Sequence, residues 1–241
     1  MAQHISRKEL KQDEIRETFV HGAEAVVSHQ KALWISAAVV ATVLLAVFGW
    51  RFYSERQTVK ASAALEGAME VFHARIRIAG EPAMPGETTY VDEKNKFEDA
   101  AKKFNEVAQQ YKRTRPGRVA LYYAGLSHVQ LGKWDEAEKT FRAVQATGDS
   151  EMSALAKYQL ARLYAQSGKA DQAVRLYQEL LAQPATLVPK PMVMLALADF
   201  YRKDKPAEAI KLLNQLKAEY PDSSLTEEAD KRLEGLSPKS E

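Results

Sequence analysis

The most distinctive hydrophobic pattern lies near the N-terminus, where residues 32–50 read ALWISAAVVATVLLAVFGW without a charged side chain. As a helix that rises about 1.5 Å per residue, this run is about 28 Å long, close to the roughly 30 Å hydrocarbon core of a bilayer. Only Ser36 and Thr42 interrupt it, and both hydroxyls can bond back to carbonyls of their own helix. Trp34 and Trp50 lie near its two ends, where amphipathic rings favour the headgroup zone. The pattern therefore predicts a transmembrane helix.

Two other kinds of segment give similar apolar runs, a cleaved signal peptide and the core helix of a soluble protein. A signal peptide has a short basic start, an apolar stretch of about 7–15 residues and a small-residue cleavage site. Here 31 residues of mixed charge come first, and the run ends in Gly49, Trp50 and Arg51. A core helix usually has polar residues along one face, which this run lacks. A retained single span fits the pattern better than either alternative.

Amphipathic patterns flank the run on both sides. Over residues 6–31, apolar residues recur at mostly three- to five-residue steps among acids and bases, which predicts an amphipathic helix. Its polar face is mixed and not basic, so packing against a partner or a second copy explains it at least as well as lying on lipid. A second helix is expected over 54–79. A cluster of glycine and proline then predicts a loop over 80–92.

Beyond residue 92 the apolar pattern repeats with a nearly constant period. The segments FEDAAKKFNEV, WDEAEKTFRAV, ADQAVRLYQEL and PAEAIKLLNQL align, at separations of 37, 36 and 36 residues, on Ala100, Ala137, Ala173 and Ala209. Four residues after each alanine comes a large apolar residue: Phe104, Phe141, Tyr177 and Leu213. Self-similarity at such a period is typical of arrays of helical repeats.

A helical stretch precedes each of the last three repeat segments. These stretches read ALYYAGLSHVQLGKW, ALAKYQLARLYAQSGKA and VMLALADFYRKDKP. Turns follow at Gly132-Lys133, Gly168-Lys169 and Asp204-Lys205-Pro206. Glycine permits the left-handed backbone conformation that ends many helices. Small residues that let neighbouring helices approach occur at Ala124, Gly125, Ala161 and Ala198. We therefore predict helix–turn–helix hairpins whose repeat alanines lie where the second helix crosses the first.

The end of the chain has the pattern of a terminal helix that covers the array. Ser224 and Glu227 have the spacing of a capping box, in which each side chain bonds to the backbone N–H of the other residue. Ala229, Leu233 and Leu236 follow at roughly helical spacing and form one apolar face. A terminal helix of a helical array needs such a face, with a charged back, for solubility.

Composition excludes several classes of function. The chain has 34 Lys and Arg against 32 Asp and Glu, and no basic stripe indicates a nucleic-acid partner. It has no cysteine, which rules out disulfides, a thiolate nucleophile, a zinc ribbon and an acylated cysteine anchor. The absence of cysteine does not identify the compartment.

No catalytic motif is present either. The five histidines form no i, i+4 pair, and the sequence contains no P-loop, no GxGxxG and no GxSxG. His128 falls on a repeat-core position, where a packed or hydrogen-bonded histidine is the expected role. Adjacent acids such as Asp135-Glu136 lie at predicted helix starts, where the helix dipole stabilises them. We therefore predict no enzyme, no cofactor and no metal site.

Residues 93–221 resemble the tetratricopeptide repeat, which has a small residue and then an aromatic in its first helix, Ala and then Phe in its second, and Pro at its end. The matching residues are Gly125, Ala137 and Phe141; then Ala161, Tyr164, Ala173 and Tyr177; and then Ala198, Tyr201, Ala209 and Pro221. His128 replaces the usual aromatic, Asp149 stands where proline is typical, and the first unit has only its second helix in clear register. We therefore expect an irregular solenoid.

In such an array the first helix of each hairpin lines the concave side. By repeat register, the residues expected to face this groove are Tyr122, Tyr158, Arg162, Asp199 and Arg202. Tyr and Arg are enriched in interface hot spots, which suggests a protein-binding groove. The same residue types also pack between adjacent repeats, and both interpretations are open at this point.

The sequence thus predicts an all-α chain with a single transmembrane helix followed by a short tetratricopeptide-like helical-hairpin solenoid. The predicted segments are a leader with an amphipathic helix (1–31), the transmembrane helix (32–53), a linking helix and loop (54–92), and the repeat domain with its C-terminal capping helix (93–241).

This architecture is similar to that of bacterial inner-membrane proteins related to the ancillary subunit of the Sec translocon. That resemblance implies a single-pass inner-membrane protein with a periplasmic repeat domain, which assists secreted or envelope proteins near the translocon with a chaperone or isomerase partner. The charges that flank the span do not decide its orientation. An alternative function is a self-associating envelope scaffold or complex-assembly protein without a chaperone role, a homo-oligomer held through residues 6–31 and 54–79.

Overall fold

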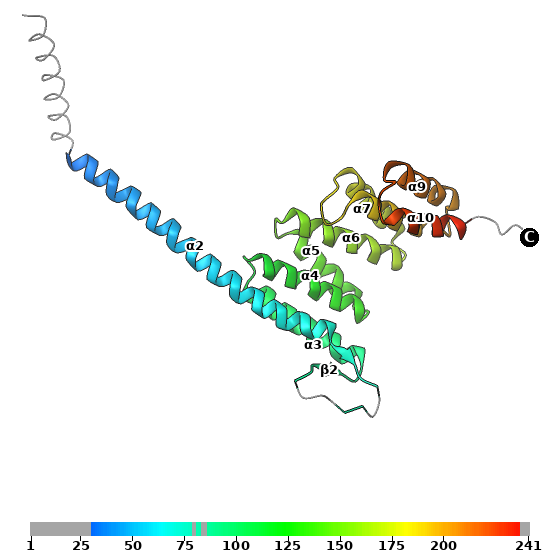
Figure 1. The fold of residues 1–241 in the computed structure, drawn as a ribbon, viewed down its shortest axis with the longest axis horizontal. Helices are drawn as coiled ribbons and strands as arrows, with labels where there is room; N and C mark the ends of the chain where they lie inside the picture. Colours follow the sequence, from blue (N-terminus) through cyan, green and yellow to red (C-terminus); the bar gives the residue numbers. More distant parts are fainter. Residues whose placement is uncertain (1–29, 79–80, 83–85, 237–241) are drawn as a thin grey trace, which may run out of the picture. The chain divides into compact units, whose positions relative to one another are not determined.

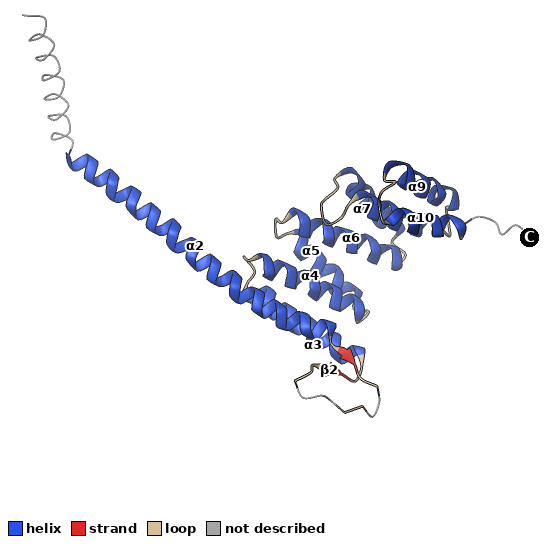
Figure 2. Cartoon of the chain, in the orientation of Figure 1, coloured by secondary structure: helices blue, strands red, loops and turns tan. Residues whose placement is uncertain are grey.

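The computed structural model describes residues 30–78, 81–82 and 86–236, and these residues are mainly helical (Figures 1 and 2). The helices among them are α2 (Gln30–His73), α3 (Glu93–Gln110), α4 (Arg115–Gln130), α5 (Trp134–Gln145), α6 (Ser150–Gln166), α7 (Ala170–Ala182), α8 (Lys190–Tyr201), α9 (Pro206–Glu219) and α10 (Leu225–Glu234). The predicted all-α class is confirmed. The predicted leader helix over residues 6–31 lies almost entirely outside the described residues.

The chain divides into two compact units, Met1–Arg56 and Gln57–Glu241, and α2 contributes to both. In the first unit, α2 is long and apolar enough to cross a membrane. Its large apolar side chains between residues 34 and 53 are 51–74% exposed. The Thr42 hydroxyl donates to the Ala38 carbonyl at 2.8 Å, as the sequence predicts. This segment is therefore not a buried core helix of the described chain.

In the second unit, α2 ends at His73, six residues earlier than the sequence indicates. Two short strands follow, β1 (Arg75–Ile76) and β2 (Thr89–Tyr90), which pair in parallel. The Arg77 N–H extends the pairing by donating to the Tyr90 carbonyl at 2.8 Å. Hydrophobic periodicity did not predict these strands, because a two-residue strand is too short to show an alternating pattern.

The later part of α2 packs as the first helix of the first hairpin. Ala68 and Val71 share one core cluster with Phe104 and other residues of α3 and α4. The Phe72 ring lies 5.9 Å from the Phe104 ring and 5.4 Å from the Tyr123 ring, centroid to centroid. The helix that the first repeat lacked in the sequence comparison is therefore α2. The predicted domain boundary at residue 93 falls inside this compact unit.

The remaining helices pair as predicted, α4 with α5, α6 with α7 and α8 with α9. Solvent does not reach any of the four repeat alanines, at positions 100, 137, 173 and 209. Gly132 and Gly168 end their helices with φ of +67° and +75°, the conformation predicted for the turns. The turn before α9 has no glycine, and Pro206 begins that helix instead.

Gly125 shows why small residues are needed where the helices of a hairpin meet. A Cβ atom at this position would lie 2.6 Å from Cε1 of Phe141, well inside van der Waals contact. Phe141 is completely buried, so its ring cannot swing into solvent to make room. The absence of a side chain at position 125 thus lets α4 and α5 pack at this distance.

Asp149, which stands where the repeat pattern has proline, has a structural role. It caps α6 by accepting from the Met152 N–H at 3.2 Å, and its carboxylate pairs with Arg118 at 3.1 Å.

The capping box predicted at Ser224 is wrong, because Ser224 has a helical backbone and its side chain caps nothing. Ser223 accepts from the Leu225 N–H instead, at 3.2 Å. The predicted apolar face of α10 is confirmed, and it packs on a cluster formed mainly by α8 and α9.

Candidate protein-binding groove

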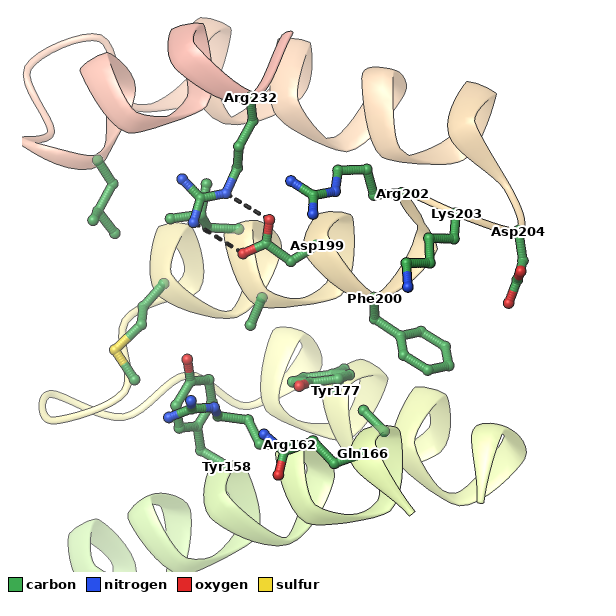
Figure 3. Close-up of a pocket in the computed structure, with 15 residues that line it drawn as sticks. Tyr158, Arg162, Gln166, Tyr177, Asp199, Phe200, Arg202, Lys203, Asp204 and Arg232 are labelled. Atoms are coloured by element: carbon green, nitrogen blue, oxygen red, sulfur yellow. Dashed lines mark hydrogen bonds and ion pairs between the residues drawn. The ribbon is translucent and has the colours of Figure 1, made fainter. Parts of the chain in front are cut away.

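A groove of about 630 Å³ opens between α6 and α8, and α10 contributes to one wall (Figure 3). The residues that line it are Tyr158, Arg162, Ala165, Gln166, Tyr177, Met192, Leu195, Ala196, Asp199, Phe200, Arg202, Lys203, Asp204, Leu225 and Arg232. Both main walls are first helices of hairpins. The sequence assigned such helices to the concave side of the array.

Four of the five residues predicted for this groove line it: Tyr158, Arg162, Asp199 and Arg202. Tyr122 does not. It is only 8% exposed, its hydroxyl accepts from Nε2 of Gln159 at 2.9 Å, and its ring lies 5.8 Å from the Phe141 ring. Tyr122 therefore fits the alternative interpretation, packing between adjacent repeats.

Two tyrosine rings pack edge to face in the groove. Tyr158 from α6 and Tyr177 from α7 have ring centroids 6.4 Å apart. Burial raises the pKa of both phenols, so both hydroxyls remain protonated donors at neutral pH. Neither hydroxyl forms a hydrogen bond with another residue that the structure describes. Tyr177 is 2% exposed although its surface forms part of the lining.

One ion pair connects α10 to the upper wall of the groove in Figure 3. Arg232 donates through Nε and Nη2 to the two carboxylate oxygens of Asp199, at 2.6 and 3.0 Å. Arg232 also pairs with Glu228 on its own helix. The Asp199 and Glu228 carboxylates raise the pKa of Arg232, although its guanidinium is charged at any physiological pH in any case. The pair holds the capping helix against α8 and neutralises Asp199.

Three further cations line the groove without an ion-pair partner among the described residues. Arg162 lies over the Tyr158 ring, 5.9 Å from its centroid, and Arg202 and Lys203 follow at the end of α8. All three are exposed. Apart from the pair between Asp199 and Arg232, the lining thus has three cations against a single carboxylate, that of Asp204.

Sequence reasoning missed several lining residues. Tyr177 was assigned to the repeat core from its position after Ala173, and it serves both the core and the groove. Arg232 could not be placed, because α10 lies outside the repeat register and no spacing rule aligns it with α8. Phe200 and Lys203 follow Asp199 and Arg202 by one residue each, and the cluster of basic and aromatic residues at this point of the sequence was the available signal.

The groove contains no arrangement of catalytic groups that we can identify. Across the described part of the chain, no three His, Cys, Asp or Glu side chains gather as a metal site requires. His128 lies away from the groove and is half-buried, and its buried Nδ1 has no hydrogen-bond partner among the residues that the structure describes. Burial lowers the pKa of its imidazole, in keeping with a role in packing.

Comparison with known families agrees with this helical arrangement. A family model described as a tetratricopeptide repeat-like domain matches residues 29–186, more than half of the 241-residue chain. The chain belongs to this family. A second model, described as tetratricopeptide repeat, matches residues 158–224, which include every lining residue of the groove except Leu225 and Arg232.

Other comparisons add little beyond the family. A solved structure of a putative kinesin light chain from Podospora anserina, with nearly identical TPR-like repeats, has a TM-score of 0.46 and 19% sequence identity. The match covers 59% of this chain and 85% of the fungal one. No curated protein matches the chain significantly. Tetratricopeptide repeats are protein-interaction modules, so the family assigns this chain the general role of a protein–protein interaction adaptor.

Proposed function

We propose that this chain is a membrane-anchored adaptor whose tetratricopeptide repeats hold a partner protein in the groove between α6 and α8. The observation that carries the proposal is the groove itself. Four residues chosen from repeat register line it: Tyr158, Arg162, Asp199 and Arg202. The groove offers rings and hydrogen-bond donors, which suit binding and provide no route for catalysis.

The exposed apolar part of α2 supports the anchor. Large apolar side chains more than half exposed in water would cost on the order of 1.5–3 kcal/mol each relative to burial. A bilayer of roughly 30 Å would cover a helical segment of this length. We propose a single span over residues 32–53, with Trp34 at one interface and Trp50, Phe52 and Tyr53 at the other.

The cellular setting follows from the resemblance in architecture to the ancillary subunit of the Sec translocon. We propose that the chain lies in a bacterial inner membrane with its repeats in the periplasm, where it assists secreted or envelope proteins with a chaperone partner. A C-terminal alkaline phosphatase fusion tests the orientation, because that enzyme is active only in the periplasm. Activity of a cytoplasmic reporter at the same position would contradict it.

Site-specific photo-crosslinking in intact cells tests groove binding in the full-length chain. The photoreactive residue replaces Gln166, an exposed residue of the lining, or Lys139, an exposed residue of α5 outside it. We expect a discrete partner adduct from position 166 and none from position 139. Equal adducts from both positions, or none from either, would refute the adaptor proposal. An adduct with a second copy of the chain would favour the self-associating scaffold instead.

A further inference from the structure

The groove between α6 and α8 offers more hydrogen-bond donors than it has acceptors to satisfy them. Donors without an acceptor among the described residues are Tyr158, Tyr177, Arg162, Arg202 and Lys203. Tyr177 is the most telling, because only 2% of it is exposed and its hydroxyl donates to no other described residue. A partner that covered this donor without offering an acceptor would lose on the order of 1–3 kcal/mol. A ligand rich in acceptors would avoid that cost.

The ion pair between Asp199 and Arg232 adds to this imbalance. Without Arg232, the groove would present two carboxylates, those of Asp199 and Asp204, to an incoming segment. With both Asp199 oxygens engaged, only Asp204 remains to attract a basic partner. Through Arg232, the capping helix α10 thus makes the lining more positive and favours an acidic partner over a basic one.

The cations stand on both sides of the rings. Figure 3 shows Arg162 on the α6 wall and Arg202 and Lys203 beyond α8, with Tyr177 and Phe200 between them. Met192 and Leu195 add apolar surface to the α8 side. A segment that lies in this groove would meet positive charge at its flanks and ring surface at its centre.

We infer that the groove binds an acidic segment of a partner protein, in which carboxylates flank an aromatic or large apolar side chain. The inference rests on the proposed adaptor function and specifies the chemistry of the partner. A basic segment would be repelled by the three cations. A purely apolar segment would leave the donors of Tyr177 and Tyr158 without acceptors.

Fluorescence anisotropy with the full-length chain in non-ionic detergent micelles tests this inference. The probe is a fluorescein-labelled peptide in which glutamates flank one tryptophan, and the matched peptide carries glutamine in place of every glutamate. We expect the glutamate peptide to bind at least about tenfold more tightly. Raising the salt from about 0.05 M to about 0.5 M should remove most of this preference.

Paired charge reversals give a matched control for total charge. The groove pair is Arg162→Glu with Arg202→Glu, and the control pair is Lys139→Glu with Lys211→Glu, two exposed lysines outside the lining. We expect the groove pair to weaken the glutamate peptide by about tenfold or more, and the control pair by less than about twofold. Tyr177→Phe keeps the ring and removes the donor, and should weaken the same peptide by about threefold to tenfold. Circular dichroism checks that each variant is folded.

Two results would overturn the inference. Equal binding of the glutamate and glutamine peptides would mean that carboxylates are not recognised. Equal loss from the groove pair and the control pair would mean that only net charge matters. If either result came together with a partner adduct from position 166, the adaptor function would stand and only the acidic character of the bound segment would be refuted. Absence of that adduct would remove the adaptor function itself.

Discussion

Replacing Gly125 with alanine measures how tightly the first helix of a hairpin packs on the second. The added Cβ would lie 2.6, 2.9 and 3.0 Å from three atoms of the Phe141 ring. Overpacking a rigid core costs about 1–3 kcal/mol. Alanine recovers about 1 kcal/mol of this free energy through its better helix propensity. The expected net result is a loss of about 1 kcal/mol in the free energy of unfolding.

Gly67 provides the matched control for this substitution. It lies inside α2, and a Cβ built there meets nothing within 4 Å. Gly67→Ala should therefore gain about 0.5–1 kcal/mol from propensity alone. The two variants should differ by about 2 kcal/mol, which is about 4–8 °C in melting temperature for a domain of this size. Urea unfolding of the full-length chain in micelles, followed by circular dichroism at 222 nm, measures the difference.

Equal stabilisation by both alanines would refute the close-packing argument. A double-mutant cycle sharpens the test, because Phe141→Leu removes the ring atoms that the new Cβ would strike. The combined variant should lose about 1 kcal/mol less than the sum of the two single losses. Strict additivity would mean that the two positions do not interact, contrary to the geometry.

Three further substitutions test other parts of the fold by the same unfolding assay. Asp149→Ala should lower the free energy of unfolding by about 1–2 kcal/mol, because it removes the cap of α6 and the ion pair with Arg118. Asp149→Asn keeps the cap and should recover about half of this loss; equal losses from the two variants would mean that the ion pair alone contributes. Gly168→Ala should lower the free energy of unfolding by about 1 kcal/mol, because φ at this position is +75°, which an L side chain disfavours. A Cβ there would meet no neighbour within 4 Å, so only this backbone strain can act, and an unchanged urea midpoint would refute it. Burial lowers the pKa of His128 in the folded chain below its unfolded value of about 6.5, so as the pH falls the unfolded chain takes up the proton first and the free energy of unfolding decreases. The urea midpoint should therefore fall less between pH 7.5 and pH 5 in His128→Phe than in the parent chain; parallel pH profiles would show that burial does not lower the pKa of this imidazole.

Strong periodic signals predicted most of the fold. The repeat alanines and the aromatic residues that follow them pack as predicted, because a 36-residue period in small and large residues constrains both helices of each hairpin. The first hairpin escaped detection because α2 and α3 are joined by the long β1–β2 connection and not by the short turn that joins the helices of the later hairpins. The capping box failed for a local reason, since a spacing pattern does not reveal whether Ser224 has the extended backbone that a cap requires.

The groove was partly predictable from the sequence. Register placed Tyr158, Arg162 and Asp199 correctly on the first helices of their hairpins. Register could not show that Tyr122 differs from Tyr158, the residue at the same position of the next repeat. Contact between α4 and α6 buries Tyr122, whereas Tyr158 lines the groove. The partner of Asp199 depends on how α10 folds back, and no repeat rule describes that packing.

The double role of α2 has a consequence for proteolysis. Ala68, Val71 and Phe72 pack in the core with α3 and α4, whereas the covalent path from α2 to α3 runs through the β1–β2 connection. A protease that cut this connection would leave the repeats held to α2 by buried apolar contacts. Release of the repeat domain would require a cut ahead of Ala61, the first buried residue of α2, within the helix itself, where hydrogen-bonded backbone resists cleavage. The repeats are therefore protected against shedding by being built partly from the helix that anchors them.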